Sequence, residues 1–252
     1  MTSIHRPLSP LDEESRRRSS IVAVPTPRQE RVPLDQTARL EHALLGPAVT
    51  PTEVDDACAS AIESGFAALI VWPNAVGRAV SAAAGTGLEV VAAVGAPIGA
   101  SLRDTKIDEA RRAMAAGARH LAVAVDAGRF RGGDAGVLAG EVVTLAYLAH
   151  AEGVHLRAVL AAAALTEDEL VIAGRLAAES GADVLQTGFG MGEHATVEQV
   201  MAARRALPPR HRDRPVIAGG ARDAGAAAAL LDGGASRVVI ADPAAVLSQT
   251  PV

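Results

Sequence analysis

Acidic and imidazole side chains occur in adjacent pairs at two points of the sequence, where they could exchange protons with a bound molecule. Glu41 and His42 form one pair, Glu193 and His194 form the other, and Asp126 stands between them along the chain. Carboxylate and imidazole groups act as general acids and bases when their pKa values are close to the working pH. We therefore predict an acid/base cluster of Glu41, His42, Asp126 and His194, against the alternative that each is a cap or a solvated loop residue.

A second group of residues could hold a small-molecule ligand by stacking, ion pairing or hydrogen bonding. Arginine suits an anion, an amide suits a polar group, and glycine exposes backbone N–H groups. Packing or a tight turn would explain the tryptophan and the glycines equally well. The predicted ligand-binding residues are Trp72, Arg157, Gln186, Gly219, Gly220 and Arg222.

The residues that usually bind metals or form covalent intermediates are scarce. The seven histidines include no HxH or HxxxH pair, and Cys58 is the only cysteine, so we predict no metal and no other cofactor. Lys106 is the only lysine, and the other 23 of the 24 basic residues are arginines. We expect Lys106 to have a surface or ion-pair role.

The composition excludes several classes of protein. A net charge of -5 and a pI near 5.8 give no electrostatic reason to expect nucleic acid as a partner. The single cysteine fits a reducing compartment, so we expect a cytoplasmic protein. No apolar run reaches the roughly 18 residues of a membrane span. The chain is 49% hydrophobic, which is ample for one continuous core.

The chain divides into a polar tail and a segment with repeated apolar runs. Residues 1–35 mix proline, serine and charge without a regular period, which predicts a disordered tail before a single domain at residues 36–252. The apolar runs lie at 38–45, 66–72, 88–95, 119–126, 154–161, 182–187, 214–220 and 236–242.

Alanine-rich segments of helical period separate these runs, and the alternation indicates a parallel sheet buried on both faces. Eight such units favour a closed (β/α)8 barrel over a doubly wound open sheet. Functional residues of such barrels lie at the C-terminal ends of the strands. We therefore expect Glu41, His42, Asp126 and Arg157 to surround the mouth of the barrel.

Several stretches resemble the deoxyribose-phosphate aldolase family, in order and at matching spacing over about residues 38–247. They are LEHALLGP, FAALIVWPNAV, VVAAVGAPIGASLRDTKIDEARRAMAAGA, LTEDEL, GADVLQTGFG, ATVEQV and VIAGGAR. The resemblance implies a (β/α)8 barrel that cleaves 2-deoxyribose 5-phosphate by class I aldol chemistry. In that family a lysine on strand six forms a Schiff base, a second lysine on strand seven lowers its pKa, and an aspartate on strand four assists. The resemblance also suggests a homodimer.

This sequence departs from the family pattern at all three of those positions. GADVLQT places Gln186 in the Schiff-base position, VIAGGAR places Val216 in that of the second lysine, and HLAVAVDAG places Ala122 in that of the aspartate. An amide nitrogen is not nucleophilic and cannot form an iminium. We predict that class I aldolase activity is absent.

The phosphate-binding turns of the family are also altered. Gly219 and Gly220 remain, but the turn after strand eight reads Ala241-Asp242-Pro243 where the family has a Ser-Ser-Gly turn. Proline removes a backbone donor, and aspartate adds negative charge, so phosphate binding is weakened unless an arginine compensates.

Two hypotheses follow from these departures. The first, which we favour, is a non-catalytic barrel that binds a metabolite or serves as the subunit of an unknown protein partner. The second is a repurposed lyase or isomerase that acts on a sugar-derived or small carbonyl compound by acid/base chemistry.

Overall fold

The computed structural model describes residues 34–247. The predicted tail therefore lies outside the described residues, apart from its last two positions. The described residues begin with the short helix η1 (Leu34–Arg39), which leads directly into the first strand.

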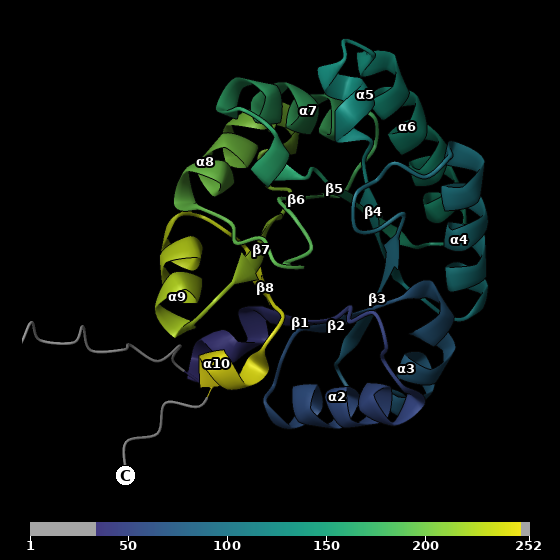
Figure 1. Cartoon of the computed structure of the whole chain (residues 1–252), viewed down its shortest axis with the longest axis vertical. Helices are drawn as coiled ribbons and strands as arrows, with labels where there is room; N and C mark the ends of the chain where they lie inside the picture. Colours follow the sequence, from purple (N-terminus) through teal and green to yellow (C-terminus); the bar gives the residue numbers. More distant parts are fainter. Residues whose placement is uncertain (1–33, 248–252) are drawn as a thin grey trace, which may run out of the picture.

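Eight parallel strands close into a ring in the order in which they occur along the chain (Figure 1). They are β1 (Leu40–Leu44), β2 (Ala68–Val71), β3 (Glu89–Val94), β4 (His120–Ala124), β5 (His155–Val159), β6 (Val184–Gln186), β7 (Val216–Ala221) and β8 (Arg237–Ile240). Each predicted apolar run coincides with one strand, although β7 extends one residue beyond the run 214–220, and β1 pairs with both β2 and β8. The predicted (β/α)8 barrel is confirmed.

Helices surround the ring on the outside (Figure 1). They are α2 (Pro51–Glu63), α3 (Val76–Ala82), α4 (Arg103–Ala115), α5 (Ala127–Arg131), α6 (Ala135–Ala151), α7 (Glu167–Glu179), α8 (Val197–Ala206), α9 (Ala224–Asp232) and α10 (Pro243–Leu247), with short 3-10 turns η2 (Pro73–Ala75), η3 (Ala162–Ala164) and η4 (Pro209–His211). Local sequence fixes several starts. The Thr50 hydroxyl accepts from Glu53 N–H, and the Glu53 carboxylate accepts from Thr50 N–H, so α2 begins with a capping box.

The barrel has two apolar layers because successive side chains of a strand point to opposite faces. The layer outside the ring packs the strands against the helices and includes Leu40 and Val216. The layer inside the ring consists of small and branched residues, among them Ala43, Ile70 and Ala122. Because the inner residues are small, the centre of the barrel has room for polar side chains and for a loop.

Candidate functional site

Glu41 and His42 lie in the first half of β1. The strand begins at Leu40, so the prediction that these two residues end it, at the mouth, is wrong. The apolar run 38–45 did not show which of its residues pair with the neighbouring strands. Since Leu40 faces the helices and Ala43 faces the interior, alternation directs Glu41 inward and His42 outward.

The strand starts surround a buried ion-pair network, which we call the barrel floor: Glu41, Glu89, Arg157 and Arg237. Arg157 Nη1 donates to Glu41 Oε2 at 2.6 Å, and Arg237 Nη1 donates to Glu41 Oε1 at 3.1 Å. Arg237 also holds Glu89 through both of its Nη atoms, at 2.7 and 2.9 Å. Arg157 was predicted at the mouth, and this is wrong because its guanidinium lies beside Glu41, with 1% of the residue exposed. One fully buried ion pair, Glu41 with Arg157, is thus joined to a half-buried pair, Glu89 with Arg237.

His42 is buried between the strand and the outer layer. Burial disfavours the imidazolium and lowers the pKa of His42 to about 4, although the charge of Asp242 opposes this shift. Its Nδ1 has no hydrogen-bond partner among the described residues. His42 is therefore a neutral core imidazole at physiological pH and does not face Glu41.

The loop between β6 and α8 reaches in over the ring from the end of β6 and turns back towards α8 (Figure 1). Phe189, in this loop, is 1% exposed and packs in the inner layer with Ala43 and Ile70. The Glu193 carboxylate accepts a hydrogen bond from Phe189 N–H at 3.1 Å, which folds the loop back on itself. An aromatic side chain of the chain itself therefore occupies the central space of the barrel.

Gly219 and Gly220, the predicted ligand-binding glycines, form the seam against which this loop packs. Gly219 N–H donates to the Thr187 hydroxyl at 2.8 Å, and both glycine carbonyls accept from Ala195 N–H, at 3.0 and 3.2 Å. A Cβ on Gly220 would lie 2.1 Å from the Glu193 carbonyl oxygen, and Gly220 has φ +87°. Close backbone approach therefore explains why glycine occupies this position.

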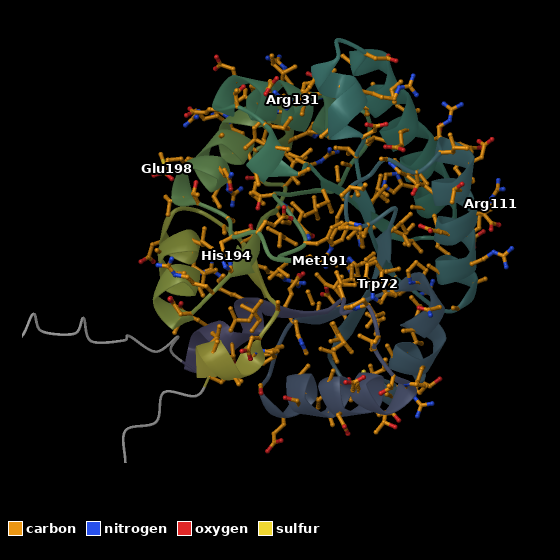
Figure 2. The ribbon with its side chains drawn as sticks, viewed as in Figure 1. Trp72, Arg111, Arg131, Met191, His194 and Glu198 are labelled. Carbon is orange, nitrogen blue, oxygen red and sulfur yellow. The ribbon has the colours of Figure 1, made fainter. Side chains whose placement is uncertain are left out.

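Asp126 and His194 lie on the mouth side, but in separate loops. Asp126 is the N-cap of α5, and its carboxylate accepts from Arg129 N–H at 3.0 Å. His194 is exposed in the β6–α8 loop (Figure 2). With Glu41 on the floor and His42 in the outer layer, the four predicted acid/base residues do not converge on one space.

Trp72 and Arg222 remain near the C-terminal ends of their strands, as predicted. Trp72 is partly buried at the end of β2, and its indole Nε1 donates to the Gly46 carbonyl at 2.9 Å. Arg222 is exposed and pairs with the adjacent Asp223 at 3.2 Å. At the end of β8, the Asp242 carboxylate accepts from Ala244 N–H at 2.9 Å and from Ala245 N–H at 3.3 Å. The Asp242 carboxylate therefore already binds the free backbone N–H groups at the start of α10.

Lys106 is fully buried in α4, with no exposed side-chain surface. Its ammonium lies 2.6 Å from Glu141 Oε1 and donates to the Ala124 carbonyl at 2.8 Å. Burial raises the pKa of Glu141, which Lys106 opposes. The expected ion-pair role is confirmed, and the partner was missed. Glu141 is the only acidic residue of an otherwise apolar helix, and that isolation was the signal.

The described residues 34–247 contain no group of three or more His, Cys, Asp or Glu side chains arranged to bind a metal ion. Within the same residues, no helix is both long enough and apolar enough to cross a membrane.

The amino-acid sequence is similar to those of known proteins. No family model matches the chain. It is 33% identical over 201 residues to a deoxyribose-phosphate aldolase of Brevibacillus brevis, covering 79% of this chain and 89% of that protein. It is 32% identical over 211 residues to the enzyme of the same name from Thermococcus gammatolerans, covering 82% and 92%. The chain belongs to the deoxyribose-phosphate aldolase family.

Solved structures of such aldolases have the same architecture. A putative deoxyribose-phosphate aldolase from Coccidioides immitis superimposes with a TM-score of 0.76 at 28% identity, covering 91% of each chain. The aldolase from Aeropyrum pernix, described as a unique tetramer, gives a TM-score of 0.77 at 22% identity, covering 85% of this chain and 90% of that one. The second likeness shows the fold alone.

The positions that the aldolase resemblance assigns to catalysis are all buried. Gln186 is on β6 inside the ring, where its Nε2 donates to the Gly188 carbonyl at 2.8 Å and its Oε1 has no hydrogen-bond partner within residues 34–247. Ala122 also faces the interior. Val216 faces the helices, and the inward residue of β7 beside it is Ile217. Neither side chain of β7 that could occupy this aldolase position carries an amine.

Proposed function

We propose that this member of the aldolase family does not carry out Schiff-base chemistry and acts as a non-catalytic barrel, which binds a metabolite or a protein partner. The observation that carries the proposal is the state of Lys106, the only lysine of the chain. A Schiff base requires a neutral amine that can reach a carbonyl group. Lys106 is instead enclosed, paired with Glu141 and hydrogen-bonded to Ala124.

The contents of the mouth support the same proposal. Phe189 fills the centre of the ring, and the β6–α8 loop packs on Gly219 and Gly220. Asp242 takes backbone donors at the start of α10 that an anionic ligand would otherwise use. A phosphate group at the start of α10 would have to displace this carboxylate. The single cysteine, Cys58, fits the cytoplasm as the place where the barrel acts.

The alternative, a lyase or isomerase that uses acid/base chemistry, has less support. It needs Glu41, His42, Asp126 and His194 around one ligand, and the structure separates them among the floor, the outer layer and two loops. No observation favours this alternative over the first proposal.

Reductive trapping of a Schiff base tests the proposal directly, because Lys106 is the only lysine that can form the adduct. The full-length protein is incubated with acetaldehyde and cyanoborohydride, and the modified amines are located by peptide mapping. We expect the adduct on the chain's N-terminal amine and none on Lys106, and no cleavage of 2-deoxyribose 5-phosphate by protein from an aldolase-deficient host. The Brevibacillus brevis relative, treated in the same way, is the positive control. A stoichiometric adduct on Lys106, or cleavage at an enzymatic rate, would overturn the proposal.

A further inference from the structure

A pocket of about 530 Å³ opens at the barrel floor, on the opposite side from the strand ends where barrel sites usually form. Its wall consists of residues at the starts of β3–β8 and of the segment that contains η4. Glu89 and Arg157 of the floor network form part of the base. Arg210, His211 and Arg214 form part of the rim. None of these rim residues belongs to the family's catalytic positions.

Two of the three carboxylates in this wall already have strong partners. Arg237 holds both oxygens of Glu89. One oxygen of Asp183 accepts from Leu156 N–H at 2.8 Å and lies 2.9 Å from His150 Nε2. The third carboxylate, Asp213, is exposed to solvent. The pocket therefore has little capacity left to bind a cation.

The arginines of the wall, by contrast, have donors to spare. Arg157 is 1% exposed, yet its Nε has no hydrogen-bond partner among the described residues, and its Nη2 is 3.6 Å from Glu89, beyond hydrogen-bond length. The Nε–Nη2 edge is the one that binds a carboxylate or phosphate with two parallel hydrogen bonds. At the rim, Arg210 donates from Nε to His211, and Arg214 donates through Nη1 to the carbonyls of Ala178 and Ala182. Burial lowers the pKa of Arg214, and the nearby charge of Asp183 opposes this shift.

Two imidazoles of the pocket lie close enough to its arginines to be affected by their charge. The rings of His120 and His155 stack with centroids 5.2 Å apart. Burial lowers the pKa of His120 to about 4, and the charge of Arg157 adds to this, against the opposing charges of Glu89 and Glu41. The pKa of His211 is also lowered, by burial first and then by Arg214 and Arg210. A bound anion would be stabilised by the same charges.

We propose that the floor pocket binds a small oxyanion, a carboxylate or a phosphate group, with Arg210 and Arg214 at the entrance and the Nε–Nη2 edge of Arg157 at the base. In the wall, Glu89 and Asp183 already accept hydrogen bonds, and Arg157 Nε has no hydrogen-bond partner among the described residues. A ligand that supplies acceptors matches this set, because a buried donor without a partner is destabilising. The site is independent of the mouth and of any aldol chemistry.

Calorimetric titration of the full-length protein with inorganic phosphate and, separately, with succinate tests the proposal and distinguishes the two sources of oxyanion. We expect saturable binding of at least one anion. Arg210→Gln should weaken it by about tenfold or more, as loss of a charge-assisted hydrogen bond does. Arg210 is at the rim, so the variant leaves the buried network intact.

Two matched arginine variants locate the binding. Arg111→Gln removes the same charge from the outside of α4, and Arg222→Gln removes it from the mouth (Figure 2 labels Arg111). Both should bind like the parent, and the NMR signals of His155 and His211, but not of His194, should shift with the anion. The proposal is overturned if neither anion binds saturably, or if Arg210→Gln binds the anion as tightly as Arg111→Gln and Arg222→Gln do. It is also overturned if only Arg222→Gln loses affinity.

Discussion

Replacing Lys106 with methionine leaves the Glu141 carboxylate buried without its cation. The pair lies 2.6 Å apart, with 0% and 3% of the two side chains exposed. Breaking a buried pair by removing one partner destabilises a protein by about 3–5 kcal/mol. Loss of the hydrogen bond to the Ala124 carbonyl adds about 1 kcal/mol. Methionine keeps most of the volume, so cavity formation contributes little.

Urea unfolding followed by circular dichroism measures this effect. With a slope of about 2 kcal/mol per molar urea, a loss of about 4 kcal/mol lowers the midpoint by about 2 M. The double variant Lys106→Met, Glu141→Gln contains neither charge, and we expect it to recover at least half of the loss. Lowering the pH should also rescue the single variant, because burial raises the pKa of Glu141 and protonation removes the uncompensated charge.

The reasoning fails if the single variant loses less than about 1 kcal/mol, since such a small loss is typical of exposed ion pairs. It also fails if the double variant is less stable than the single one. In either case the pairing with Glu141 does not hold Lys106 in place, and it does not prevent Lys106 from reacting as an amine.

Three further predictions follow from buried groups. Glu41→Gln should lower the free energy of unfolding by about 3 kcal/mol in urea melts, because Arg157 is left buried without its nearest carboxylate; an unchanged midpoint would contradict the floor network. Phe189→Ala should cost about 3–5 kcal/mol by opening a cavity in the ring, whereas Met191→Ala, at a residue 36% exposed, should cost far less; equal losses would mean that Phe189 does not fill the mouth. The pKa of His42 is lowered to about 4 in the folded state. Between pH 6.5 and 4 the unfolded chain therefore binds a proton at His42 that the folded chain does not bind. The free energy of unfolding should fall by about 3 kcal/mol as the pH drops through that window. His42→Gln should flatten that slope in thermal melts between pH 7 and 4, and an unaltered slope would assign the effect to other groups.

The fold was predictable from the pattern of apolar residues. The eight apolar runs are separated by segments of helical period, and continuous apolar strands of this kind are stable only when both faces of a sheet are covered. Each run coincides with one strand of the observed barrel, to within one residue at the end of β7. Capping residues such as Thr50 and Thr166 act within one helical turn, so their roles are also local and visible in the sequence.

The end of a strand at which each polar residue lies, and the residue that it faces, could not be predicted in this way because both depend on long-range pairing. Glu41 was assigned to the mouth and lies on the floor, because a run of apolar residues does not record where pairing with β2 and β8 begins. Its partners Arg157 and Arg237 are 116 and 196 residues away along the chain. The filling of the mouth by Phe189, and the enclosure of Lys106 by Glu141, likewise depend on contacts between distant segments. The period of apolar residues indicates whether a side chain is buried or exposed. Its chemistry depends on which side chains lie next to it, and these are brought together only when the barrel closes.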